Sequence, residues 1–389
     1  MSEYQYYEFR AIDRRLSGVD IKRLRDLSTR AEITPVSFTN HYEWGDFKGD
    51  PRKVMWQYFY AFLYLANWGT RRLMLRLPAD LIDADAAEPY CVDDSLSLEV
   101  KGGDALVEFH SEDEDGDWEH DGQGLLEDML PLREALAGGD LRPLYVGWLA
   151  CVNEGLVEED EPEPPVPPGL RTRPPALEAM VDFLRVPADL LSVAAERSPE
   201  WRGPADPTRG ELAAKVAALA EADRNAALLD LLEGEPEAAR RALLRKLRPA
   251  GAASLAPPGV NTGRTAGALV AAANAIAEAR RTAQKERAAK EKARRDAEAA
   301  AERAKYLDCV AGREEKVWDE VEAKVGSKQQ AEYDAAVRLL KDLRDLSLRD
   351  GAARSFEARV RALQARHTKK STFVKRLQKA GLLKWGEAG

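Results

Sequence analysis

The sequence has few of the side chains that most often bind metals or carry redox chemistry. Its 389 residues include three cysteines and four histidines. Cys91, Cys151 and Cys309 lie far apart and form no C-x-x-C pair, so neither a zinc finger nor a disulfide framework is indicated. We therefore expect no metal site and no cofactor, with the cytoplasm as the simplest compartment.

Long apolar runs and complete catalytic motifs are also absent from the sequence. The densest apolar run, residues 59–68, is well short of the roughly 20 residues that a membrane-spanning helix needs. The amino terminus has no basic segment followed by an apolar one, as a secretory signal would have. No G-x-x-x-x-G-K-[ST] loop, no G-x-G-x-x-G after a predicted strand and no G-x-S-x-G turn occurs. These absences argue against membrane association and lean against an enzyme.

Acidic and basic residues are unevenly distributed along the chain, whose net charge is −9. Residues 1–170 hold 35 acidic and 16 basic residues, whereas residues 171–389 hold 32 acidic and 42 basic ones. The positive excess lies within residues 335–384, which contain 14 Lys or Arg and 4 Asp or Glu. Such a division is typical of a surface for a partner, or of two ends that attract each other.

Strand signals and aromatic residues are concentrated in the first 160 residues. Residues 4–12 are rich in Tyr and Phe, residues 71–78 alternate Leu with Met and Arg, and residues 95–112 form two alternating arms around a K-G-G-D turn. Residues 51–68 have the apolar spacing of a helix. We predict an α+β N-terminal domain with a mostly antiparallel sheet and helices, followed by a mainly α-helical C-terminal half with a long charged helix.

Composition divides the rest of the chain into segments. The prolines of residues 158–175 predict a semi-rigid linker or, alternatively, a ligand for an aromatic groove. Residues 268–325 have very high helix propensity, but almost no large apolar residue between Ile276 and Tyr306. Such a helix could be a solvated spacer reaching on the order of 60 Å, a helix packed on the middle bundle, or a self-associating coiled coil. The predicted organisation is an acidic α+β domain (1–157), a Pro-rich linker (158–175), a helical bundle (176–249), a flexible linker (250–267), a long Ala/Lys/Arg/Glu-rich helix (268–325) and a basic helical tail domain (327–385).

The stretch HYEWGDFKGDP, residues 41–51, collects several reactive residue types. His41, Glu43, Asp46 and Asp50 could bind a metal or share acid–base work. However, no H-x-x-E, H-E-x-x-H or H-x-D signature is present. A local explanation is more specific, because Asp50 is a good helix N-cap and Pro51 a good first helical residue. We favour the end of a strand, a turn and the start of a helix.

Two consecutive arginines follow in ANWGTRRLMLRLP, residues 66–78. Arg71 and Arg72 could hold a phosphate or a carboxylate, or they could complement the negative end of a preceding helix. A ligand-binding or catalytic site in this domain would require side chains from both stretches to converge, with His41 and Asp46 on the same side of the sheet. Its candidate members are His41, Glu43, Asp46, Arg71 and Arg72.

An acidic loop offers the other candidate for a metal. Asp113, Asp115 and Asp117 alternate as at the start of a calcium-binding loop. The position that requires glycine in such a loop is Trp118, and Gly116 is out of place. A solvated acidic loop is the favoured interpretation.

Basic residues in HTKKSTFVKRLQKAGLLKW, residues 367–385, form a candidate partner-binding patch. Phosphate groups or an acidic partner would need such charges, with Phe373 and Trp385 interleaved. A basic helical face can also serve only to keep a protein soluble. The members of the patch are Lys369, Lys370, Lys375, Arg376 and Lys379.

Two parts of the chain resemble known families. The first comprises the stretches YQYYEFRAIDRRLS (4–17), HYEWGDFKGDP (41–51), ANWGTRRLMLRLP (66–78) and PPVPPGL (164–170). On these stretches the first 170 residues resemble an uncharacterised family of bacterial proteins, which implies no particular activity and no catalytic residues. The tail, from YDAAVRLLKDLRDL to FVKRLQKAGL, is similar to the end of bacterial SWIM-type zinc finger proteins. The C-x-C…C-x-H ligands of those proteins are absent here, so neither zinc nor a DNA-binding role follows.

Together these patterns favour a non-enzymatic cytoplasmic interaction or scaffold protein, whose partner is another protein. The first alternative is a nucleic-acid-associated factor that binds through the basic C-terminal helices. The second is an enzyme with a site near His41, Glu43 and Asp46.

Overall fold

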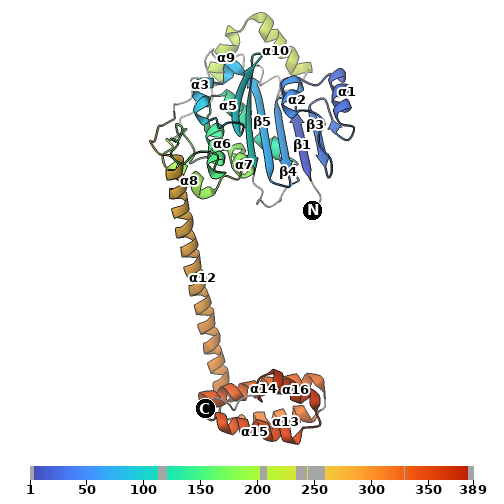
Figure 1. Ribbon diagram of the computed structural model, residues 1–389, viewed down its shortest axis with the longest axis vertical. Coiled ribbons are helices and arrows are strands. Elements are labelled where there is room, and N and C mark those ends of the chain that lie inside the picture. Colours follow the sequence, from blue (N-terminus) through green and yellow to red (C-terminus); the bar gives the residue numbers. More distant parts are fainter. Residues whose placement is uncertain are drawn as a thin grey trace. The chain divides into compact units, whose positions relative to one another are not determined.

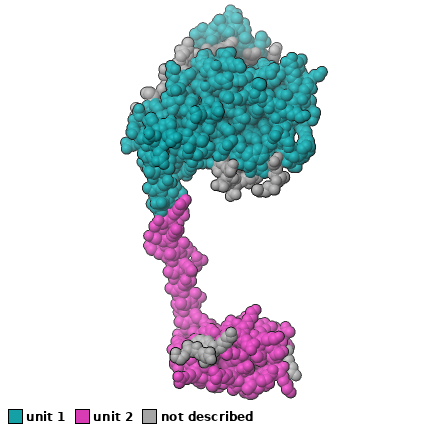
Figure 2. Space-filling view, viewed as in Figure 1, with its two compact units in different colours: residues 1–280 teal, residues 281–389 magenta. Residues whose placement is uncertain are grey.

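The computed structural model describes most of the chain and divides it into two compact units (Figures 1 and 2). Unit 1 comprises residues 1–280 and unit 2 comprises residues 281–389. None of the described helices combines the length and the apolar character that crossing a bilayer requires. The described residues are 4–112, 121–201, 208–233, 243, 259–327 and 329–383.

Unit 1 is built on one seven-stranded sheet in which all neighbouring strands are antiparallel. The strand order is β2-β3-β1-β4-β5-β7-β6. This confirms the predicted α+β class and the hairpin around the K-G-G-D turn. The strands are β1 (Gln5–Arg10), β2 (Glu32–Ile33), β3 (Ser37–Tyr42), β4 (Ala61–Ala66), β5 (Thr70–Pro78), β6 (Leu96–Lys101) and β7 (Asp104–Glu112).

Alternate residues of the strands β1, β4, β5 and β7 enter two different cores, because successive side chains point to opposite faces of a sheet. Tyr7 and Phe62 lie on the face covered by α1 (Gly18–Leu27) and α2 (Pro51–Tyr58), which we call the α1 face. Tyr6 and Leu63 lie on the other, which we call the α6 face. Its core includes residues of α3 (Ala84–Ala87), α4 (Leu125–Met129), α5 (Pro131–Ala137), α6 (Arg142–Asn153), α7 (Pro175–Phe183), α8 (Ala188–Glu196) and the first turns of α12 (Ala266–Val310).

The helix predicted over residues 51–68 is shorter than expected. It begins where the sequence indicates: the Asp50 carboxylate accepts from the N–H of Arg52 at 2.9 Å, and Pro51 is the first helical residue. It ends at Tyr58, and residues 61–66 form the central strand β4. Every residue of β4 is buried, so its apolar run carries no alternation that would distinguish a strand from a helix.

The proline-rich segment is part of unit 1 and not a linker between domains. Val166 and Leu170 are fully buried in the α6-face core. Prolines cannot donate backbone hydrogen bonds, but their neighbours can. Val166 pairs with Val260 through two backbone bonds of 2.9 Å, and Glu163 N donates to the Arg264 carbonyl at 2.9 Å. Residues 158–167 and 259–267 therefore run antiparallel, side by side, on the same core, and we call them the paired segments.

A buried ion pair joins the paired segments. The Glu163 side chain is fully buried, and Arg264 donates to it from Nη2 at 2.8 Å and from Nε at 2.9 Å. Tyr145 of α6 donates its hydroxyl to the same carboxylate at 2.5 Å, and the Thr262 hydroxyl contacts it as well. Burial, and then the charge of Glu163, raise the pKa of Tyr145, which keeps its hydroxyl protonated as a donor.

The chain leaves this core after Trp201, whose ring lies 4.1 Å from the guanidinium of the buried Arg142, and returns at Val260. Gly169 N donates to the Pro199 carbonyl at 2.8 Å, close to the Val166–Val260 pair. A Cβ on Gly259 would lie 2.8 Å from the Pro165 carbonyl oxygen, so this approach requires glycine.

The bundle predicted over 176–249 is divided, because α7 and α8 belong to the core whereas the described side chains of α9 (Arg209–Ala218) and α10 (Glu221–Glu233) are largely exposed. Residues 234–242 and 244–258, which hold much of the predicted flexible linker, lie outside the described residues.

Helix α12 (Ala266–Val310) runs from unit 1 into unit 2. Leu269 and Ala273 are buried in the α6-face core, residues 278–302 are exposed throughout, and Leu307 and Val310 are buried in unit 2. The long helix predicted to reach residue 325 ends at Val310, before Gly312 adopts a φ of 80°. The other helices of unit 2 share one apolar core: α13 (Glu314–Gly326), α14 (Gln330–Arg349), α15 (Ala353–Arg366) and α16 (Ser371–Lys379).

Candidate functional site

His41 and Asp46 lie on opposite sides of the sheet. His41 pairs with Tyr6, an α6-face residue, and its exposed ring stacks on Tyr4 with centroids 6.3 Å apart. Asp46 Oδ1 instead accepts from Gln5 Nε2 at 2.8 Å, and the Gln5 Oε1 accepts from Tyr7 on the α1 face. The geometry that an enzymatic site around these residues requires is therefore not formed.

The two candidate arginines also point to opposite faces, as consecutive residues of β5 must. Arg71 donates to the Phe183 carbonyl at 2.5 Å, where it complements the C-terminal end of α7. Arg72 Nε donates to Glu108 Oε1 at 3.0 Å. The preceding residues 67–69 form the turn between β4 and β5, not the helix end considered as the alternative. The structure thus does not bring Arg71 and Arg72 together with His41.

Glu43 lies instead near a second acidic residue. Burial, followed by the charges of Asp121 and Glu43, raises the pKa of Tyr4. The Tyr4 hydroxyl donates to the Asp121 carbonyl at 2.8 Å. The carboxylates of Glu43 and Asp121 therefore contribute negative charge near Tyr4, at the end of the sheet where β1 begins.

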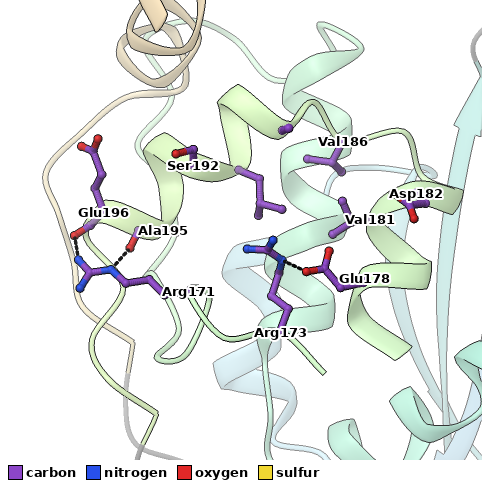
Figure 3. A pocket seen from close by; sticks show the side chains of 11 residues that line it. Arg171, Arg173, Glu178, Val181, Asp182, Val186, Ser192, Ala195 and Glu196 are labelled. Carbon is purple, nitrogen blue, oxygen red and sulfur yellow. Dashed lines mark hydrogen bonds and ion pairs between the residues drawn. The ribbon is translucent and has the colours of Figure 1, made fainter. Parts of the chain in front are cut away.

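A groove between α7 and α8 is a feature of unit 1 that the sequence analysis did not predict (Figure 3). Its volume is about 520 Å³, within the range of roughly 300–1,000 Å³ common for ligand pockets. Arg173 donates to Glu178 at 2.9 Å, and Arg171 donates to the carbonyls of Ala195 and Glu196 at 3.1 and 2.7 Å. Its apolar wall could receive a partner's side chain. Both arginines fall in the segment that its prolines made look like a linker, so no sequence signal marked them.

The basic patch of unit 2 divides into two groups. Lys370 donates to the Val325 carbonyl at the end of α13. Arg376 lies 3.1 Å from Asp334 and donates to the Gln330 carbonyl at 2.6 Å, which holds α16 on α14. These two cations stabilise the unit. The exposed remainder, which we call the lysine face, consists of Lys369, Lys375 and Lys379.

Among the described residues, no three His, Cys, Asp or Glu side chains are grouped so that they could hold a metal ion. The acidic loop with Asp113, Asp115 and Asp117 lies outside those residues, as does Trp385.

Comparison with known proteins gives no relative from which a role could be transferred: no protein-family model, no curated protein and no solved structure matches the chain.

Proposed function

We propose that the chain is a non-enzymatic interaction protein in which α12 connects two partner-binding units. The observation that carries the proposal is the exposure of residues 278–302 between helix ends that are buried in different cores. A stretch that buries nothing gains no stability from packing. It depends on helix propensity and on i,i+4 pairs such as Arg295–Glu291 at 3.6 Å, each contributing about 0.2–0.5 kcal/mol. A sequence that maintains such a helix without a core is well suited to a connector.

The chemistry of the candidate residues supports the same proposal. Asp46 accepts a hydrogen bond from Gln5, and Arg71 and Arg72 are engaged by an α7 carbonyl and by Glu108. Such contacts stabilise the fold, whereas catalysis requires groups that converge on one reacting atom. Interaction surfaces have no such requirement.

We expect unit 2 to contribute to partner binding. Affinity capture from cells that produce the protein should recover at least one partner with the full chain that is lost when residues 327–389 are deleted. The same experiment with Lys369→Glu, Lys375→Glu and Lys379→Glu in the full chain shows whether the lysine face is responsible. An unchanged set of partners in both cases would remove unit 2 from the proposal.

A nucleic acid is the second candidate partner, favoured by the exposure of the lysine face. Lys375 and Lys379 lie one turn apart on α16, on the side opposite to the buried Phe373 and Leu377. If each lysine of the face contacts a phosphate, the triple glutamate variant should reduce the slope of log affinity against log salt by about 2.7 on double-stranded DNA.

Fluorescence anisotropy with labelled DNA at several salt concentrations measures this slope. The charge-matched control replaces three exposed basic residues of unit 1, by Lys22→Glu, Arg23→Glu and Lys53→Glu. Equal losses in both triple variants would indicate only an effect of net charge. If the unaltered chain does not bind at low salt, this candidate is excluded.

A further inference from the structure

Two exposed tryptophans lie on either side of the start of β1. Gln5 pairs with Tyr42 of β3 on one side and with Ala66 of β4 on the other. Trp44 comes two residues after Tyr42, and Trp68 comes two residues after Ala66. The strand register therefore places both tryptophans at the same end of the sheet. Their side chains are 66% and 42% exposed, which is high for residues that usually bury most of their surface.

Tyr4 connects the segments that carry these tryptophans. Its N–H donates to Asn67 Oδ1 at 3.0 Å, directly before Trp68, and its ring stacks on His41, three residues before Trp44. A single exposed apolar residue needs no explanation, but a group of aromatic side chains at one end of a sheet is typical of an interaction surface. We call this surface the aromatic edge. It consists of Tyr4, His41, Trp44 and Trp68.

Carboxylates lie beside the aromatic edge. Glu43 and Asp121 are exposed, and burial, followed by the charges of Asp121 and Glu43, raises the pKa of the Tyr4 hydroxyl, which donates to the Asp121 carbonyl at 2.8 Å. A partner that covers this edge is therefore favoured if it brings positive charge.

The chain already shows how a cation binds to this surface. The guanidinium of Arg30 lies 4.1 Å from the centre of the Trp44 ring, and the indole remains largely exposed. Arginine combines a planar cation that stacks on an indole with donors that match a carboxylate, whereas the ammonium of lysine is a compact, strongly hydrated charge.

We propose that the aromatic edge binds an arginine-bearing segment of a partner protein, with guanidinium groups stacked on Trp44 and Trp68 and paired with Glu43 and Asp121. This deepens the proposed function, on which it rests, by giving the chemistry of the partner of unit 1. It does not depend on the lysine face.

Fluorescence anisotropy with three labelled ten-residue peptides and the full chain tests the proposal. The peptides repeat Arg-Gly, Lys-Gly or Gln-Gly. The arginine peptide should bind more tightly than the lysine peptide, and the glutamine peptide should not bind. Because each exposed cation–π contact contributes about 0.5–1 kcal/mol, Trp44→Ala with Trp68→Ala should weaken binding of the arginine peptide roughly tenfold. Glu43→Gln with Asp121→Asn should weaken it several-fold and reduce its dependence on salt.

Matched variants separate recognition from folding and from net charge. Trp44→Phe with Trp68→Phe should retain part of the affinity, since phenylalanine also accepts a cation on its face. Val100→Ala and Asp85→Asn remove an exposed apolar side chain and an exposed acid elsewhere, and should leave binding unchanged. Thermal unfolding should be the same for all variants. Equal binding of the arginine and lysine peptides, or full affinity in the double alanine variant, would overturn the proposal. Partner capture through unit 2 would be unaffected by that result.

Discussion

Replacing Glu163 with alanine should lower the free energy of unfolding of unit 1 by about 3–5 kcal/mol. The change leaves the Arg264 guanidinium, in a mostly buried position, without its counterion, and it removes the acceptor of the buried Tyr145 hydroxyl. The cost of such an unpaired buried charge exceeds the loss of a single neutral hydrogen bond. The change is measured by chemical denaturation, with unfolding of unit 1 monitored by amide hydrogen exchange in peptides derived from residues 1–280.

Glu161→Ala is the matched control for this experiment. Glu161 lies on the same one of the paired segments, but its side chain is exposed, so its removal should change stability by no more than about 0.5 kcal/mol. Glu163→Gln retains the size of the side chain and an acceptor for Tyr145, and should fall between the two. A Glu163→Ala protein as stable as the control would show that the ion pair does not hold the paired segments together.

Replacing Phe373 with alanine should destabilise unit 2 by about 3–5 kcal/mol and leave unit 1 unchanged. Phe373 is fully buried in the core of unit 2, where its ring lies 5.6 Å from that of Tyr333. The cavity left by the missing ring lies in a core that shares no residue with those of unit 1. Hydrogen exchange should therefore accelerate in α13–α16 and stay slow in the strands of the sheet.

The control is Lys375→Ala. Lys375 comes two residues after Phe373 and lies on the exposed side of α16, so its replacement should leave hydrogen exchange in both units unchanged. Equal loss of protection in β4 and β5 of the Phe373→Ala protein would contradict the division into two units that unfold independently.

Local patterns predicted much of the fold. The start of α2 at Asp50 and Pro51 and the hairpin of β6 and β7 depend on contacts within a few residues, and both are present. The proline-rich segment was misread because its burial depends on distant partners: Arg264 binds Glu163 from 101 residues further along the chain. Composition describes what a segment can do alone, but not what it packs against.

The candidate sites show the same limit. The residue types in HYEWGDFKGDP were visible in the sequence, but the side of the sheet on which each one lies follows from strand register. Likewise, Lys370 and Arg376 were indistinguishable from Lys375 in the sequence. Only contacts with α13 and α14 show that the first two stabilise unit 2.

The course of the chain through the proline-rich segment has a consequence for engineering. It leaves the core after Trp201 and returns at Val260. Pro199, just before the exit, and Val260 are both hydrogen-bonded to the short stretch between Val166 and Gly169. The two ends of the intervening region are thus fixed close to the same stretch of chain. Because the entropy of closing a loop changes slowly with its length, we expect that the region can be shortened or lengthened with little loss of stability of the core. A reporter protein placed there would be attached at two neighbouring points and would leave α12, the aromatic edge and the lysine face unaltered.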